Sequence, residues 1–156
     1  MLVGPWWRGF LLAVMPPCER SAKLDRVVLR TLTVRCLIVD DSANFRDAAS
    51  AMLERAGFSV VGMASNSVDA MALYRELRPD VTLVDVDLGA ESGFDLAVAL
   101  QAAYSPAPSV ILISTHSEQD FADMIAASPV LGFLPKFALS PGAIRDLLAE
   151  KVSGER

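Results

Sequence analysis

Acidic and polar side chains follow several short apolar runs in this sequence. Asp40 and Asp41 come directly after one run, and Asp85 comes after another. Two more runs are followed by Ser114 and Lys136. Carboxylates brought close together repel one another and raise one another's pKa unless a cation neutralises them, and a ligand set made only of oxygen suits Mg²⁺. If the runs are neighbouring strands, the sequence predicts a magnesium site with a hydroxyl group and a lysine beside it.

Each of these residues alone has an ordinary structural explanation. An aspartate or a serine at the end of a strand often caps the next helix, and a lysine in a loop is usually solvated. The combination is harder to explain in this way, because an acid pair, a lone acid, a hydroxyl and a lysine each follow a different apolar run. We therefore treat them together as one candidate site.

The apolar runs have the length and pattern of buried strands. Val110–Ile113 is apolar at successive rather than alternate positions, which is typical of a strand buried on both faces of a parallel sheet. The strand candidates are Val34–Val39, Ser59–Met63, Val81–Val84, Val110–Ile113 and Gly132–Leu134.

The segments between these runs have helical spacing. From Phe45 to Ala56, apolar residues recur three and four apart, and Gly57 then provides a C-terminal stop. A second helix should begin after the cap candidate Ser67. The other helix candidates are Phe94–Ala103, Glu118–Ala127, which should end before Pro129, and Pro141–Lys151. This order predicts an α/β protein of (βα)₅ type with a doubly wound parallel sheet, whose site lies at the carboxyl ends of the strands.

Composition limits the class of protein. The chain has 156 residues, 53% of them hydrophobic and 21% charged, which indicates one folded domain with a tail. Its net charge is −5, and the negative charge lies after residue 33, so the main domain is unsuited to holding nucleic acid by itself. Cys18 and Cys36 form no disulfide or metal framework, so we expect a reducing, cytoplasmic location.

The domain boundaries follow from a change in pattern near residue 33. Residues 1–33 read as an N-terminal extension that is disordered or results from a start site assigned too far upstream. The apolar piece Phe10–Met15 is much shorter than the roughly 20 residues that span a bilayer, so we expect no membrane segment. Residues 34–151 then form the domain, and residues 152–156 form a short C-terminal tail.

The strand-end motifs resemble the receiver domain of two-component response regulators, from Val34 to Lys151. The matching stretches are CLIVDDS at 36–42, VTLVDVDL at 81–88 with Ser92 and Gly93, VILIS at 110–114, and GFLPK at 132–136. This resemblance implies a flavodoxin-like fold with strand order 2-1-3-4-5. It also implies a bacterial signalling module that acts in a phosphorelay.

The resemblance implies a role for each acidic residue. Asp85 would accept a phosphoryl group from a phosphohistidine on a sensor histidine kinase or a histidine phosphotransfer protein. Asp41 and Asp85 would bind Mg²⁺ directly, and Asp40 would bind it through water. The backbone carbonyl of Asp87 would complete the protein ligands.

The remaining site residues would bind the phosphoryl group and transmit its arrival. Lys136 and Ser114 would each contact a phosphoryl oxygen. Movement of Ser114 toward that oxygen would open space for Phe133, although Phe133 reads equally well as a plain core residue. The mouth of the site would be flanked by the side chains of Asp87, Thr115 and His116.

The resemblance leaves three outputs open: binding of another protein, relay of the phosphoryl group, or action as a phosphate sink. The module would not be an enzyme in the usual sense, although it would assist its own phosphorylation and slow autodephosphorylation. Because the chain ends soon after the fifth predicted helix, we expect a single-domain response regulator with a downstream protein partner and no direct contact with nucleic acid or membrane. A dimer through the fourth helix, fifth strand and fifth helix is a further possibility.

Two other functions compete with this one. Asp85-Val86-Asp87 resembles the DxD motif of haloacid-dehalogenase-type phosphatases, Mg²⁺-dependent enzymes that also form aspartyl phosphates. In those enzymes the motif follows the first strand, whereas here the acid pair comes first. The second alternative is a receiver-like scaffold that binds partners without phosphorylation. Nucleotide binding is disfavoured, because the sequence contains no GxGxxG or GxxxxGK[ST] run.

The N-terminal extension should be dispensable for folding, because all the predicted strands and helices lie after it. We expect a chain that begins at Thr33 to fold with the same cooperativity as the full chain, as measured by circular dichroism during urea denaturation. Loss of the folding transition in the shortened chain would contradict the boundary.

Overall fold

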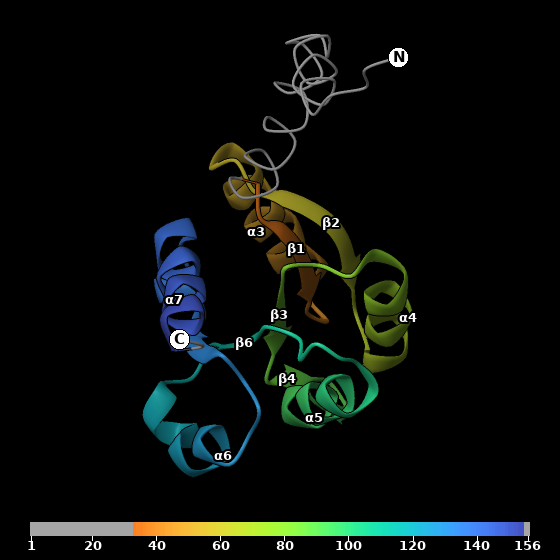
Figure 1. The fold of residues 1–156 in the computed structure, drawn as a ribbon, viewed down its shortest axis with the longest axis vertical. Helices are drawn as coiled ribbons and strands as arrows, with labels where there is room; N and C mark the ends of the chain where they lie inside the picture. Colours follow the sequence, from red (N-terminus) through yellow and green to blue (C-terminus); the bar gives the residue numbers. More distant parts are fainter. Residues whose placement is uncertain (1–32, 155–156) are drawn as a thin grey trace, which may run out of the picture. The chain divides into compact units, whose positions relative to one another are not determined.

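The computed structural model describes residues 33–154. The predicted N-terminal extension and Cys18 therefore lie outside the described residues. Five strands form one parallel sheet with the order β2-β1-β3-β6-β7 (Figure 1). This is the predicted order 2-1-3-4-5. The bounds of the strands are β1 Arg35–Val39, β2 Ser59–Ala64, β3 Val81–Asp85, β6 Val110–Ser114 and β7 Gly132–Pro135.

Helices cover both faces of the sheet and enclose two apolar layers. The helices are α3 Ala43–Arg55, α4 Ser67–Leu77, α5 Gly93–Ala103, α6 Ala122–Ala126 and α7 Pro141–Gly154. Side chains of α3 and α7 pack with Ile38 and Ile111 on one face, whereas α4 and α5 pack with Leu37 and Leu112 on the other (Figure 1). Alternate residues of the central strands thus face opposite layers, as expected for a doubly wound sheet.

Several helix boundaries differ from the predicted ones. The second helix is capped by Asn66 rather than Ser67, because the Asn66 side chain accepts a hydrogen bond from the Asp69 amide at 2.8 Å. The last helix continues to Gly154, so most of the expected tail is helical. The fourth predicted helix is divided into a 3₁₀ turn, η1 (Glu118–Phe121), and α6, and it ends before Pro129 as expected.

A short hairpin follows β3 that the sequence did not predict. Its strands are β4 (Asp87–Leu88) and β5 (Glu91–Ser92), which pair in antiparallel register. Gly89, in the turn between them, has φ +74°, a conformation that L residues rarely adopt. The hairpin therefore gives the segment between β3 and α5 a defined backbone conformation.

One polar side chain lies inside the central strand β3 without a partner. Thr82 is fully buried, and its Oγ1 has no hydrogen-bond partner among the described residues. A buried hydroxyl that loses its bonds to water in this way destabilises the folded state. The Thr82 hydroxyl therefore destabilises the buried part of this strand.

Replacing this hydroxyl by a methyl group should stabilise the fold. We expect Thr82→Val to raise the free energy of unfolding by about 1 kcal/mol, because the shape is kept and an unpaired polar group is removed. Urea denaturation measures the change. Thr82→Ser is the matched control and should lower stability, since it keeps the hydroxyl and removes a methyl group. A destabilised valine variant would show that the hydroxyl has a partner.

Candidate functional site

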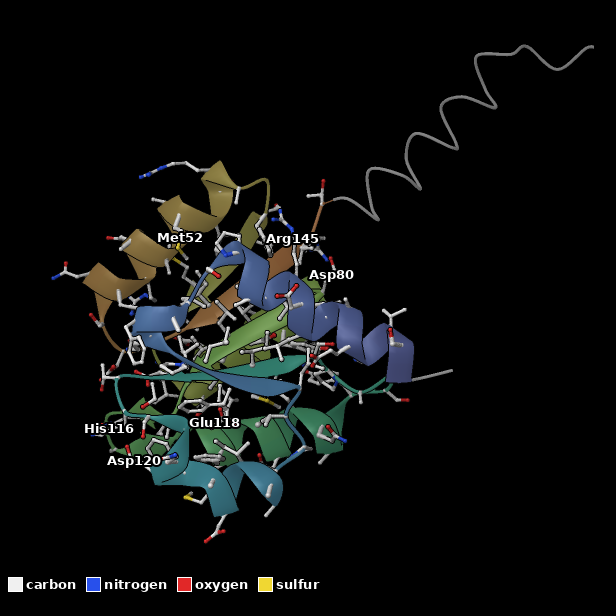
Figure 2. The ribbon with its side chains drawn as sticks, turned by 90° about the vertical axis from the view of Figure 1, so that its left-hand side faces the viewer. Met52, Asp80, His116, Glu118, Asp120 and Arg145 are labelled. Atoms are coloured by element: carbon white, nitrogen blue, oxygen red, sulfur yellow. The ribbon has the colours of Figure 1, made fainter. Side chains whose placement is uncertain are left out.

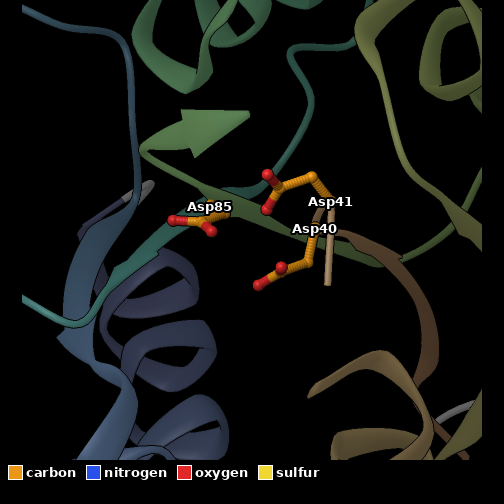
Figure 3. A group of neighbouring side chains, drawn as sticks. All are labelled: Asp40, Asp41 and Asp85. Carbon is orange, nitrogen blue, oxygen red and sulfur yellow. The ribbon is translucent and has the colours of Figure 1, made fainter. Parts of the chain in front are cut away.

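Three aspartates meet at the carboxyl ends of the two central strands. Asp40 and Asp41 follow β1, and Asp85 is the last residue of β3; the strands are paired side by side with Val39 opposite Val84. One carboxylate oxygen from each aspartate lies within 4.8 Å of the others (Figure 3). Asp40 is fully buried and Asp85 is 5% exposed, whereas Asp41 faces solvent. The fold therefore gathers these acids as the strand-end argument predicted.

Lys136 reaches the acidic cluster from across the sheet. It follows β7, and its Nζ lies 2.6 Å from Asp40 Oδ2 and 3.0 Å from Asp85 Oδ2. The same ammonium group lies 4.3 Å from the centre of the Phe45 ring in α3, which adds a cation–π contact. Lys136 thus contacts two of the three carboxylates, and Arg46, which donates to the Asp40 backbone carbonyl, is a second cation nearby. The three acids still outnumber these two cations, so the cluster keeps an excess of negative charge.

Burial and the contact between Asp85 and Lys136 have opposite effects on the pKa of each of these two groups. Burial raises the pKa of Asp85, the charge of Asp40 adds to that shift, and the hydrogen bonds from Lys136 and from the Asp87 amide oppose it. Burial also lowers the pKa of Lys136, but its contacts with the two carboxylates outweigh this effect and leave the lysine pKa above its ordinary value. Lys136 is therefore a cation throughout the physiological pH range.

Backbone amides hold the carboxylates in place. Asp40 Oδ1 accepts a hydrogen bond from the Ser42 amide at 2.8 Å, and Asp85 Oδ1 accepts one from the Asp87 amide at 3.1 Å. The Asp40 amide donates to the Ala64 carbonyl at 3.0 Å, which attaches this residue to the end of β2. Asp40 and Asp85 are thus positioned by main-chain groups of β2, of the residue that caps α3, and of Asp87 just after β3.

The donor set is suited to Mg²⁺. All three grouped side chains offer oxygen, and among the described residues the partner of Asp40 Oδ2 is the Lys136 ammonium, 2.6 Å away. A hard cation with several waters of its own would neutralise the excess charge. The residues present therefore fit a magnesium ion.

The hydroxyl candidate lies on the next strand of the sheet. Ser114 is the last residue of β6, it is 2% exposed, and its Oγ accepts a hydrogen bond from the His116 amide at 3.0 Å. Thr115 and His116 are exposed beyond it, and Figure 2 labels His116 at the edge of the domain. Because Asp85 pairs with Ile113, the next residue of β6, Ser114, lies beside the carboxyl end of β3.

Phe133 packs in an aromatic group behind the site. It is 7% exposed in β7, and its ring centre lies 6.1 Å from that of Phe121. Phe121 also lies 5.9 Å from Phe94 and 6.0 Å from the His116 ring. This placement agrees with a core residue and equally with a switch residue in its inward position.

Gly93 supports the site in a way that the sequence analysis did not predict. A Cβ built on this residue would lie 2.1 Å from the Asp85 carbonyl oxygen, and the Gly93 amide donates to the Val86 carbonyl at 2.8 Å. The start of α5 therefore approaches the phosphoacceptor candidate too closely for any side chain. The available signal was a glycine directly after the helix cap Ser92.

Comparison with known proteins places the chain in a family. The model of the response regulator receiver domain matches residues 36–148, and the chain belongs to this family. Receiver domains act in bacterial two-component signalling as phosphoacceptors that are generally not enzymes, and they typically bind Mg²⁺ at an acidic pocket. They interact with histidine kinases and downstream effectors.

Individual relatives agree with this assignment. A protein-glutamate methylesterase/protein-glutamine glutaminase of Idiomarina loihiensis is 34% identical over 107 residues, which cover 67% of this chain and 28% of that protein. The chain spans about a third of the length of the methylesterase relatives that it matches. The chemotaxis protein CheY of Thermotoga maritima is 33% identical over 85 residues, 54% of this chain and 70% of that one.

The solved structures show the same fold. The signal receiver domain of the putative response regulator NarL from Mycobacterium tuberculosis superposes with a TM-score of 0.62 at 28% identity, over 78% of this chain and 94% of that one. Among the described residues, no helix is long and apolar enough to cross a membrane.

The close approach at Gly93 can be tested directly. Gly93→Ala should lower the free energy of unfolding by about 1–3 kcal/mol, because the new methyl group displaces the Asp85 backbone. Gly142→Ala in α7 is the matched control, since the nearest atom to its Cβ is 4.0 Å away, and it should be close to neutral. Equal stability of the two variants in urea would contradict the packing described.

Proposed function

We propose that this chain is a phosphoacceptor module that receives a phosphoryl group on Asp85 from a phosphohistidine of a sensor histidine kinase or a histidine phosphotransfer protein. The observation that carries the proposal is the placement of Asp85. It ends the central strand β3, next to Asp40 and Asp41, with the Lys136 ammonium 3.0 Å from its Oδ2. Such a carboxylate is oriented and flanked by the positive charge that phosphoryl transfer requires.

The metal would be held by the acids of the two central strands. Asp41 and Asp85 would bind it directly, Asp40 through water, and the Asp87 backbone carbonyl would complete the protein ligands. When bound, Mg²⁺ would supply positive charge against the oxygens of the transferred group. The fit rests on the close grouping of the three carboxylates and on the fact that the Lys136 ammonium contacts only two of them among the described residues.

The protein side chains would divide the remaining work. An Asp85 carboxylate oxygen attacks phosphorus while the phosphorus–nitrogen bond breaks, and the electron pair of that bond leaves with the imidazole. The Lys136 ammonium donates to one phosphoryl oxygen, and the Ser114 hydroxyl donates to another. Ser114 Oγ accepts from the His116 amide, so its own proton is free for this contact.

The same contacts would produce a switch. Movement of Ser114 toward the phosphoryl group lengthens its 3.0 Å contact with the His116 amide and opens space next to the aromatic group that holds Phe133. A shift of Phe133 would then alter the surface of α6, β7 and α7, where a downstream protein or a second copy would bind. A cytoplasmic location, a single-domain architecture and the boundaries 34–151 remain predictions.

The module would also hydrolyse its own acyl phosphate slowly. Asp41 and the side chains of Asp87, Thr115 and His116 are exposed at the mouth, so water reaches the site. A haloacid-dehalogenase-type phosphatase is disfavoured, because Asp85 ends β3 rather than the first strand of the sheet and the family match is to the receiver domain. A scaffold that works without phosphorylation is the remaining alternative. Modification of the wild-type protein by acetyl phosphate would exclude this alternative.

The acceptor assignment predicts a single site of modification. With Mg²⁺ and acetyl phosphate, the protein should gain one phosphoryl group, and Asp85→Asn should gain none, because the amide is not a competent nucleophile. Intact-mass analysis measures both. Asp87→Asn is the control and should still be modified, since the contacts assigned to Asp87 at the metal and at Asp85 are made by its backbone, which the substitution keeps. Modification of the Asp85 variant would place the acceptor elsewhere, and no modification of the wild type would favour the scaffold.

The ligand assignment predicts a metal-binding defect. Asp41→Ala should weaken Mg²⁺ binding by about tenfold or more. Loss of a residue that only hydrogen-bonds to a metal ligand often has an effect of that size, and Asp41 would be a ligand itself. Calorimetric titration measures it. Asp47→Ala, which removes an exposed acid from α3, is the control for net charge. An unchanged titration for Asp41→Ala would refute its role as a ligand.

A further inference from the structure

The hairpin after β3 is attached to a distant helix by one side chain. The Ser67 amide, in the first turn of α4, donates a hydrogen bond to Glu91 Oε2 at 3.1 Å, although the two residues are 24 positions apart. Glu91 belongs to β5, which pairs with β4. Asn66 already caps this helix through the Asp69 amide. Glu91 therefore supplies a second acceptor to the same helix terminus from another part of the chain.

The hairpin also contacts two aspartates of the acidic cluster. The Asp87 amide in β4 donates to Asp85 Oδ1 at 3.1 Å. A Cβ built on Gly89, at the turn, would lie 3.8 Å from Asp41 Oδ2. The position of the hairpin thus affects the carboxylates at the ends of both central strands.

The contact at Ser67 closes a ring of contacts around the site. The Asp40 amide is bonded to the Ala64 carbonyl at the end of β2, and the chain then runs directly into α4 and Ser67. From Ser67 the Glu91 contact leads to the hairpin, and the hairpin leads back to Asp85. Without Glu91, no hydrogen bond given for the described residues joins the hairpin to α4.

We propose that Glu91 is a positioning residue for the metal site. By accepting the hydrogen bond from the Ser67 amide, Glu91 holds the hairpin, and with it the Asp87 carbonyl, in the arrangement that binds Mg²⁺. This inference rests on the proposed function, because it assumes the metal site at Asp40, Asp41 and Asp85. When the hairpin leaves this arrangement, the competent fraction of the protein falls and the apparent dissociation constant rises in proportion. The loss of one hydrogen bond, the one that Glu91 accepts from the Ser67 amide, accounts for a change of about two- to fivefold.

The test compares variants that separate contact from charge. Glu91→Ala should raise the Mg²⁺ dissociation constant about two- to fivefold in calorimetric titration of the full chain. Glu91→Gln keeps an acceptor oxygen and should bind Mg²⁺ within about twofold of the wild type. Asp95→Ala, an exposed acid four residues further on, loses the same charge without the contact and should bind like the wild type.

Hydrogen exchange provides a second readout that requires no metal. The Ser67 amide should exchange faster in Glu91→Ala than in the wild type, and Glu91→Gln should restore much of the protection. Equal Mg²⁺ affinity of Glu91→Ala and the wild type would overturn the inference and leave the proposed function intact. An equal loss in the alanine and glutamine variants would also overturn it, because charge alone would then explain the effect. A wild-type protein that binds no Mg²⁺ would overturn both.

Discussion

The ion pair between Lys136 and the two buried aspartates is the interaction on which the site depends. Asp40 is fully buried and Asp85 is nearly so, and two carboxylates at this distance would repel each other strongly in a medium of low polarity. The lysine ammonium, within 3.0 Å of both, offsets that repulsion. The cluster is thus stable enough to form, and its remaining negative charge is what attracts a divalent cation.

The parallel sheet explains why these residues meet. Both faces of the central strands are covered by helices, so the carboxyl ends of β1 and β3 are where polar side chains can gather without disturbing the core. The surrounding loops then adjust the site at short range. Gly93 allows α5 to approach the Asp85 carbonyl, and Ser42 and Asp87 provide amides for the carboxylates.

Sequence reasoning predicted the parts that local pattern determines. Successive apolar residues such as Val110–Ile113 identify a strand buried on both faces, and the acids at the strand ends then converge because the strands are parallel. The hairpin at Gly89 was missed because its strands have only two residues each, too few to show a period. The contact between Glu91 and Ser67 was missed because it depends on a tertiary approach across 24 residues. The cap at Asn66 was missed for a smaller reason, because adjacent polar residues compete for one cap. Whether Phe133 moves depends on the difference between the unphosphorylated and phosphorylated states. Neither the sequence pattern nor a single conformation determines that difference.

A double-mutant cycle between Lys136 and Asp85 tests the central claim most directly. The free energy of unfolding would be measured in urea, with a chelator present, for the wild type, Lys136→Met, Asp85→Asn and the double variant. If the lysine stabilises this carboxylate, Lys136→Met lowers the free energy of unfolding less in the Asp85→Asn background than in the wild type. The expected coupling energy is about 1 kcal/mol or more. Effects that add to within about 0.3 kcal/mol would contradict the account, because the two side chains would then not interact across the site.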